Sequence, residues 1–265
     1  MHPTMATPTS QGPRPLRGFR VALAFLTRLP GGVHADSGAA VGRSVGWFPV
    51  VGALVGLLGG ASYWGANLVT SNAVAAVVAF AVTAAATGAL HEDGLADTVD
   101  ALAGGLTVED RQRILSDPRH GTFGVLSLVL LTVAKVGALA AVDVSDAVGL
   151  LIVAHLGARL GSVFMLAFAP ISEGQGSARS VAVAVGRPGV FYAVIVGAGL
   201  TVLALFNIVD LLVGLSVTVG AIAFSVALMT LWAWKRVGGI NGDTIGAAEQ
   251  LSELSVLVLL GGLLT

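Results

Sequence analysis

Long apolar segments alternate with short polar segments along most of this chain, and their lengths indicate membrane-spanning helices. Each apolar segment is close to the ~20 residues that a helix needs to cross a bilayer. We predict seven spans, at 45–69, 73–90, 122–142, 147–169, 190–207, 210–234 and 245–264. Before them, residues 1–17 are expected to form a disordered tail, and residues 18–29 a short helix at the membrane interface. The pattern therefore predicts an all-α, polytopic membrane helix bundle, with one membrane-embedded domain over residues 18–265.

Composition supports this class and excludes several others. Hydrophobic residues make up 55% of the 265 residues and charged residues only 11%, whereas soluble domains carry about 25% charged residues. The richness in Val, Leu and Ala argues against intrinsic disorder, and the absence of Cys excludes a disulfide scaffold. A net charge of −1 gives no indication of nucleic-acid binding. The expected surroundings are a lipid bilayer.

The distribution of basic residues predicts the orientation of the bundle. If the N-terminus is cytoplasmic, 12 of the 14 Lys and Arg residues fall on the cytoplasmic side, and the outer loops 70–72, 143–146 and 208–209 carry none. Cytoplasmic loops of membrane proteins are enriched in Lys and Arg. We therefore expect the N-terminus inside, the C-terminus outside, and any chemistry in the cytoplasmic segments. The other two basic residues, Lys135 and Arg159, fall within spans.

Acidic residues are concentrated in the segment 91–100, which reads HEDGLADTVD. Asp93, Asp97 and Asp100 have the spacing i, i+4, i+7, which places three carboxylates on one face of a helix. Such like charges repel, and Mg²⁺ is the usual divalent cation where phosphates supply further ligands. The alternative is a solvated polar helix end, or an acidic helix cap.

The segment 117–124 forms a second candidate, immediately before an apolar run. Pro118 and Gly121 favour a turn here, and Arg119 and His120 would then lie beside a helix N-terminus. Basic side chains and the free N–H groups of a helix N-terminus together bind anions such as phosphate. The alternative is a turn that carries the positive charge expected of a cytoplasmic loop.

A glycine-rich segment, 238–249, leads into the last apolar run. Its glycines, including Gly242, let the backbone approach a ligand closely, while Asp243 is either a functional carboxylate or a helix N-cap. Glu249 and Glu253 follow inside the apolar run, where carboxylates are costly and usually face an interior site. Lys135 and Arg159 are the natural counter-charges, and spacing alone does not assign the pairs. A structural buried pair is the alternative for these four residues.

Taken together, these segments resemble the cobalamin synthase (adenosylcobinamide-GDP ribazoletransferase) family. The matching stretches are FLTRLP at 25–30, WFPVVG at 47–52, 91–100, 117–124 continuing to Lys135, and 238–249. The combination of DGLADTVD at 93–100 with GDTIGA at 242–247 is the most specific part. Three departures are the HED start at 91–93, Asn241 where Thr is more common, and Leu160 where an aromatic residue often follows Arg159.

The resemblance implies a reaction and a location. A member of this family joins adenosylcobinamide-GDP to α-ribazole, or to its 5′-phosphate, with release of GMP. The product is adenosylcobalamin or its 5′-phosphate. The resemblance further implies dependence on Mg²⁺ and a place in the bacterial cytoplasmic (inner) membrane.

Applied to this reaction, the candidate residues divide into three groups. They are the Mg²⁺ ligands Asp93, Asp97 and Asp100; the catalytic residues Asp243, His91 and Asp97; and the substrate-binding residues Arg119, His120, Gly242 and Glu249. Asp243 is expected to be a ligand or the base that takes the hydroxyl proton, and His91 is the rival base. Glu249 is expected to orient Asp243 or the metal shell.

Two other functions remain as alternatives. A CDP-alcohol phosphotransferase also uses an Asp cluster, but its signature requires Asp-Gly-x-x-Ala-Arg and a downstream Asp pair. Here Asp93-Gly94 is followed by Ala96-Asp97, and the downstream pair is absent. A secondary transporter would instead use a cation relay of charges inside the bundle, made of Asp243, Glu249, Glu253 and Lys135. Release of GMP from a cobinamide-GDP substrate separates the three functions.

Overall fold

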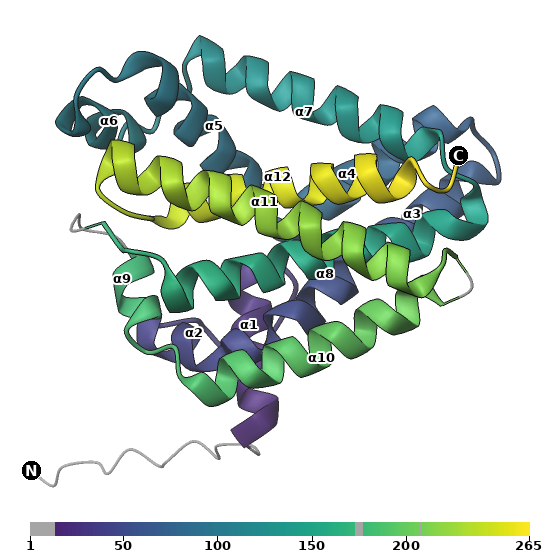
Figure 1. The fold of residues 1–265 in the computed structure, drawn as a ribbon, viewed down its shortest axis with the longest axis horizontal. Coiled ribbons are helices and arrows are strands. Elements are labelled where there is room, and N and C mark those ends of the chain that lie inside the picture. Colours follow the sequence, from purple (N-terminus) through teal and green to yellow (C-terminus); the bar gives the residue numbers. More distant parts are fainter. Residues whose placement is uncertain (1–13, 173–176, 207) are drawn as a thin grey trace, which may run out of the picture.

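The structure is a computed structural model that describes residues 14–172, 177–206 and 208–265, and over these residues the elements are helices (Figure 1). They are α1 (Arg14–Leu26), α2 (Gly38–Ser44), the 3-10 helix η1 (Val45–Trp47), α3 (Phe48–Asn67), α4 (Asn72–Thr87), α5 (Leu90–Gly104), α6 (Val108–Leu115), α7 (Thr122–Ala140), α8 (Val144–Phe168), α9 (Ser177–Ala182), α10 (Arg187–Leu205), α11 (Leu211–Val237) and α12 (Gly242–Gly261). The expected all-α membrane bundle is confirmed.

Six of the seven predicted spans correspond to helices that are long and apolar enough to cross a membrane. The first of these is the continuous stretch Gly38–Asn67, and the others are α7, α8, α10, α11 and α12. The second predicted span, at 73–90, differs. Its helix α4 has 16 residues, which corresponds to about 24 Å at 1.5 Å per residue and is shorter than the hydrocarbon core of ~30 Å.

A sharp bend explains this difference. Gly88 ends α4 in the left-handed conformation with φ +67°, and Ala89 follows with φ +54°, which is uncommon for a residue other than Gly. The axis of α5 then departs by 92° from that of α4. The backbone N–H of Arg28 donates to the Ala86 carbonyl (2.7 Å) and braces the bend. The acidic segment therefore lies on a separate helix, turned away from its predicted span.

Helix α8 is the centre of the bundle, packed against α3, α10, α11 and α12. Its contact with α3 depends on small residues. A methyl group on Gly52 would lie 2.6 Å from the His155 carbonyl oxygen, and one on Gly56 would lie 2.6 Å from the Ile152 Cα. Glycine at this four-residue spacing lets two membrane helices touch backbone to backbone.

The first helix begins earlier and ends earlier than predicted. It spans Arg14–Leu26 instead of 18–29, so residues 14–17, which we expected in the tail, form its first turn. The rest of the predicted tail, residues 1–13, lies outside the described residues. Val21, Ala22 and Leu26 of α1 are buried in a core shared with α3 and α8. This packing brings α1 against the wall of the cavity described next.

Candidate functional site

A cavity of about 220 Å³ lies where α5 and α12 cross. Five of the predicted site residues line it, namely His91, Asp93, Gly242, Asp243 and Glu249. The opposite wall is mostly apolar and comes from α1, α3, α8 and α9; it includes Phe25, Leu26, Phe48, Leu166 and Val181. One side of the cavity can therefore bind charged groups, while the apolar side excludes water.

Two glycines allow α5 and α12 to approach closely enough for their acidic residues to meet. A methyl group on Gly94 would lie only 2.8 Å from the Asp243 carbonyl oxygen, and one on Gly246 would lie 3.2 Å from the His91 Cα. Any larger residue at Gly94 would push the two backbones apart. Segments that are about 150 residues apart in the chain thus form one site, and the resulting proximity is a property of the fold.

Three carboxylates and one histidine lie together beside this cavity, and two of them, Asp93 and Asp243, line it. His120 bridges two turns of α5, with Nε2 3.4 Å from Asp93 Oδ1 and Nδ1 3.2 Å from Asp97 Oδ1. The negative charges of Asp97 and Asp93 also act on Asp243. We call Asp93, Asp97, Asp243 and His120 the carboxylate mouth. Asp93 is exposed and Asp97 and Asp243 are half-buried, so a solute can reach all three.

Asp100 has a different environment from the other two residues of the predicted ligand triad. Its Oδ2 accepts from the Gly121 N–H (2.6 Å), and its Oδ1 accepts from the Gly124 N–H (2.8 Å). Asp100 is buried and satisfies backbone donors at the start of α7, which would otherwise lack partners. It therefore fastens α7 to α5, and it fixes the position of His120, which directly precedes Gly121.

Arg119 is next to the mouth in sequence but is held by its own loop. Its Nε and Nη2 donate to the two oxygens of Asp117 at 2.9 and 2.7 Å, and its side chain is exposed. Hydrogen bonds from the Arg119 side chain and backbone lower the pKa of Asp117 to about 2. The pair is thus fully charged at neutral pH, and the Nε and Nη2 donors of Arg119 must leave Asp117 before they can bind a phosphate.

Asp243 does not cap α12. The N-cap is Asn241, whose Oδ1 accepts from the Thr244 N–H (2.9 Å), while Thr244 Oγ1 accepts from the Asn241 N–H (2.9 Å). This reciprocal arrangement is a capping box. The capping alternative for Asp243 is therefore wrong, and the carboxylate lines the cavity, where its Oδ2 accepts from Asn241 Nδ2 (3.4 Å). The same bonds give Asn241 a structural role at a position where the family more often has Thr.

Below the mouth, the charged residues of the spans form a closed buried network. Lys135 Nζ donates to Glu253 Oε2 (2.7 Å) and to Gln250 Oε1 (2.6 Å). Arg159 pairs with Glu253 through Nη1 and lies 3.4 Å from Glu249 through Nε. The buried network, as we use the term, consists of His91, Lys135, His155, Arg159, Ser162, Glu249, Gln250 and Glu253. All eight residues are buried, and the pairs that spacing left unassigned are now defined.

His91 belongs to this network through both of its ring nitrogens. Nε2 lies 2.9 Å from Glu249 Oε2, and Nδ1 lies 3.3 Å from Arg159 Nη2. Because a guanidinium only donates hydrogen bonds, Nδ1 must be the acceptor, and the proton of the neutral ring is on Nε2, facing Glu249. No lone pair of His91 then remains for a substrate proton. Glu249 in turn accepts from the Ser162 hydroxyl.

The sequence analysis did not name Ser162, Gln250 or His155 as site residues. His155 is packed within its span, and its Nδ1 lies 2.9 Å from Glu253 Oε1. A signal was present, because His155, Arg159 and Ser162 repeat the i, i+4, i+7 spacing that identified the acidic face of α5. In an apolar span, polar residues at this spacing indicate one buried polar face.

The carboxylate mouth offers hard oxygen donors but no closed metal shell. Among the described residues, no group of three or more His, Asp or Glu side chains is arranged to enclose a metal ion. Mg²⁺ seldom needs such a shell, since it usually binds through one or two carboxylates, waters and substrate phosphates. The oxygen donors of Asp93, Asp97 and Asp243 fit that kind of open site.

Comparison with known proteins covers nearly the whole chain. A family model described as cobalamin-5-phosphate synthase matches residues 18–261. A protein of Ralstonia nicotianae named adenosylcobinamide-GDP ribazoletransferase is 36% identical over 256 residues, which cover 92% of this chain and 94% of that protein. Proteins of the same name from Bradyrhizobium diazoefficiens and Shewanella frigidimarina are 38% and 33% identical, and each match covers 91% of this chain and 92% of the relative. No solved structure matches the chain.

Proposed function

This chain belongs to the cobalamin-5-phosphate synthase family, and we propose that it is the membrane enzyme that transfers adenosylcobinamide phosphate from adenosylcobinamide-GDP to α-ribazole. GMP is released, and adenosylcobalamin is formed; with α-ribazole 5′-phosphate as acceptor, the product is adenosylcobalamin 5′-phosphate. The names of the relatives support the donor and the ribazole acceptor. The observation that carries the proposal is that Asp93 and Asp243 line one cavity, with Asp97 close enough to both to share His120 with Asp93 and to act on the charge of Asp243.

The chemistry requires a base, and Asp243 is our candidate. A ribose hydroxyl of the acceptor attacks the cobinamide-linked phosphorus, a new P–O bond forms, and the P–O bond to the GMP group breaks. This hydroxyl is not the 5′-hydroxyl, because the 5′ oxygen already carries the phosphate in α-ribazole 5′-phosphate and in its product. The hydroxyl proton passes to the Asp243 carboxylate, and GMP departs with the electron pair of the broken bond. Asp243 suits this role because it is half-buried and does not serve as the helix cap.

Mg²⁺ is part of the proposal, and Asp93 and Asp97 are the residues that would hold it. When bound, it neutralises charge on the pyrophosphate and on the departing phosphate. Three neighbouring carboxylates repel one another, and this repulsion favours a site that attracts a cation. His120 contacts both proposed ligands. When protonated, it is a positively charged partner for the same carboxylates, weaker than Mg²⁺.

The remaining predicted residues have supporting roles in this proposal. His91 holds Glu249 and the crossing of α5 and α12 in place, because its two nitrogens face buried partners. Gly242 lines the cavity with no side chain in the path of the substrate. Arg119 exchanges Asp117 for a substrate phosphate, an exchange that its full exposure permits.

We further propose that the carboxylate mouth faces the cytoplasm in the bacterial inner membrane. The support is the charge distribution, since the loop of Arg119 and His120 and the end of α11 with Lys235 and Arg236 both adjoin the mouth in sequence. This places the site where nucleotide substrates are present. With the bent pair α4 and α5 counted as one broken span, which makes seven crossings, the N-terminus would be cytoplasmic and the C-terminus outside.

The two alternative functions have less support. A cation relay needs charges that gain and lose partners along a path, whereas Lys135, Glu249 and Glu253 neutralise each other and Arg159 in a closed arrangement. The CDP-alcohol phosphotransferase alternative lacks its signature, and the relatives described above carry a different name. Both alternatives remain outcomes of the experiment below.

The test uses membranes from cells that express the chain, incubated with adenosylcobinamide-GDP, α-ribazole and Mg²⁺. We expect GMP and a complete cobalamin product in equal amounts by liquid chromatography, and no reaction when EDTA is added. Membranes with an Asp243→Asn variant at equal expression are the control. Absence of GMP release, together with release of CMP from a CDP-alcohol, would overturn the proposal in favour of the phosphotransferase alternative.

A further inference from the structure

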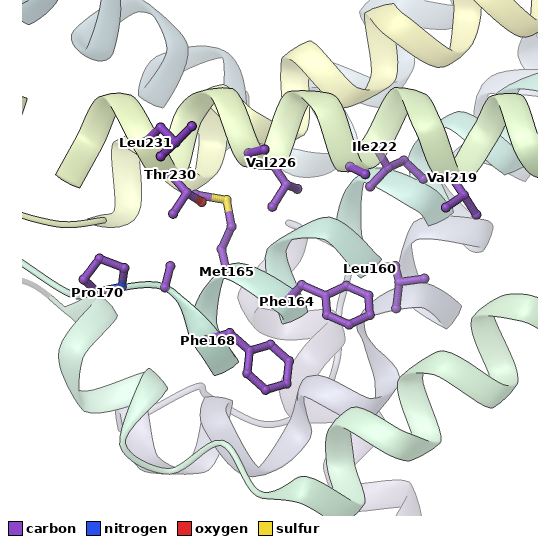
Figure 2. Close-up of a pocket in the computed structure, with 13 residues that line it drawn as sticks. Leu160, Phe164, Met165, Phe168, Pro170, Val219, Ile222, Val226, Thr230 and Leu231 are labelled. Carbon is purple, nitrogen blue, oxygen red and sulfur yellow. The ribbon is translucent and has the colours of Figure 1, made fainter. Parts of the chain in front are cut away.

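A second and larger cavity, of about 570 Å³, lies between α8 and α11 and is separate from the site (Figure 2). It is lined by Leu160, Phe164, Met165, Phe168, Ala169, Pro170, Val219, Ile222, Ala223, Val226, Ala227, Thr230 and Leu231. None of these residues lines the cavity beside Asp243. The two cavities lie on opposite sides of α8, since Ser162 and Leu166 line one and Leu160, Phe164 and Phe168 line the other. We call this second cavity the lateral groove.

The lateral groove exists because small residues of α11 face large residues of α8. Ala223 and Ala227 are exposed and leave space on α11, while Phe164 and Phe168 stack with ring centroids 6.1 Å apart on α8. Figure 1 also shows α10 and α11 converging toward their connection and separating toward their other ends, with α8 between them. None of the described residues of α10 lines the groove, and we call its end at Thr230 and Leu231, toward the separated ends of α10 and α11, the open end.

The position of the groove in the membrane limits what can fill it. Helices α8, α10 and α11 are all long and apolar enough to span the bilayer, and the apolar parts of α10 and α11 are mostly exposed outside the bundle. Thr230 is the one hydroxyl-bearing residue in the lining described above, so water would find few partners there. Hydrocarbon chains of bilayer lipids are the solvent that surrounds this surface.

The open end of the groove is basic. Along α11, the lining pairs 222/223, 226/227 and 230/231 repeat every four residues, and the next pair in this row is Trp234 and Lys235. Both are exposed, as is Arg236. Arg187, also exposed, is the first residue of the antiparallel helix α10 and lies at the same end. An aromatic ring and cations at a membrane interface match the phosphate of a lipid headgroup.

We propose that the lateral groove is a binding site for an anionic glycerophospholipid. One acyl chain fills the lateral groove between Phe164 and Ala227. The headgroup phosphate lies at the open end of the groove, beside Trp234 and Lys235. Acyl chains gain stability from burial against apolar side chains, and the cations select an anionic headgroup. The site is independent of the proposed reaction, and the lipid takes no part in the chemistry.

The test is native mass spectrometry of the purified protein in detergent, titrated with phosphatidylglycerol. We expect one tightly held lipid on the wild-type protein and at least about tenfold weaker binding to an Ala227→Trp variant, which fills the groove. Leu228→Trp is the matched control, since Leu228 is the next residue on α11, is exposed, and does not line the groove. Equal affinity of the two variants would overturn the site.

The headgroup part of the proposal has its own comparison. In the wild-type protein, phosphatidylglycerol should bind at least about tenfold more tightly than phosphatidylcholine of the same chains. The double variant Lys235→Gln, Arg236→Gln should lose most of this preference and still bind lipid. If the wild-type protein binds both lipids equally, selection of an anionic headgroup is wrong.

A measurement on the wild-type protein covers the case in which the Ala227→Trp variant does not fold. Phosphatidylglycerol with a photoreactive acyl chain is crosslinked in liposomes, and the modified peptides are identified. We expect modification of the peptides containing Phe164–Phe168 and Val226–Leu231, reduced by excess unlabelled phosphatidylglycerol. Crosslinks confined to other faces of α10 and α11, or unaffected by competition, would contradict the site.

Discussion

The carboxylate mouth and the buried network are neighbours that hold charge in opposite ways. At the mouth, Asp93, Asp97 and Asp243 are exposed or half-buried, and His120 lies within 3.4 Å of the first two. In the network, two cations and two carboxylates, namely Lys135, Arg159, Glu249 and Glu253, neutralise one another and are each at most 4% exposed, with Glu249 at the wall of the cavity. One region has excess negative charge, and the other has none.

This contrast separates a group that awaits a ligand from a group that holds the fold. A buried ion pair is costly to form, and removing one partner leaves an uncompensated charge, which is more costly still. The network residues are thus tied to each other. The mouth can lose a carboxylate without leaving a charge stranded, since removal relieves repulsion. Loss of a mouth residue should therefore damage activity, and loss of a network residue should damage stability.

The largest expected effect is that of Asp243→Asn. If Asp243 is the base, the activity of the variant should be lower by a factor of about 10²–10⁴, the range for loss of a general base. Its thermal stability should stay near that of the wild-type protein. The measurement is the initial rate of GMP release from membranes with matched expression. Asp210→Asn is the control, because Asp210 is exposed and caps α11, and Asn caps a helix as well as Asp. Activity of Asp243→Asn within a few-fold of wild type would remove Asp243 from the reaction.

For the network, Arg159→Met is the sharpest test. The variant removes the positive charge that Arg159 places beside the carboxylates of Glu249 and Glu253. Removing one partner of a buried ion pair lowers the free energy of unfolding by about 3–5 kcal/mol. We expect a large fall in the unfolding temperature of the detergent-solubilised protein, and lower yield from the membrane. Arg113→Met, which removes an exposed arginine on α6, should leave the unfolding temperature unchanged. A stable Arg159→Met protein that has lost activity would show that the network takes part in the chemistry.

A smaller effect is expected when a proposed Mg²⁺ ligand is neutralised. In Asp93→Asn, the Mg²⁺ concentration for half-maximal activity should rise by about tenfold, equivalent to 1.4 kcal/mol of binding, while stability is unchanged. The measurement is activity against Mg²⁺ concentration. Glu109→Gln, an exposed acidic residue on α6, gives the same change in net charge without this shift. An unaltered Mg²⁺ requirement in Asp93→Asn would exclude Asp93 as a ligand.

Much of the fold follows from the sequence, because membrane spans need a continuous apolar length. That rule fails for the run at 73–90, where Gly88 and Ala89 adopt left-handed conformations and turn the chain by 92°. Ala89 carries no local signal for such a conformation, and the contact of Arg28 with Ala86 that braces the bend is a tertiary one. Hydropathy measures transfer of side chains to lipid, and it is insensitive to a turn made of small residues.

The sequence predicted which residue types form the site and which helix face carries them. It was less successful in assigning a role to each residue. Spacing placed Asp93, Asp97 and Asp100 on one face of a helix correctly, but spacing does not reveal which carboxylate meets backbone donors. Only the approach of Gly121 and Gly124 distinguishes Asp100. In the same way, spacing does not reveal whether His91 can act as the base. That question is decided by Glu249 and Arg159, two buried residues from other helices that face its two ring nitrogens.

Asp100 gives the smallest expected effect and the finest test of the comparison, because it is buried like the network residues but lies on the same helix, α5, as Asp93 and Asp97. As a cap of α7, it should behave like a structural residue, and Asp100→Ala should cost about 0.5–2 kcal/mol of stability, as loss of an N-cap does. Activity should fall only partly, since His120 loses its fixed position, and the Mg²⁺ requirement should stay at the wild-type value. Unfolding temperature and activity against Mg²⁺ concentration are measured on the same preparation. If instead the Mg²⁺ requirement rises as in Asp93→Asn, Asp100 is a metal ligand, as its spacing predicts, and its bonds to Gly121 and Gly124 must open when the metal binds.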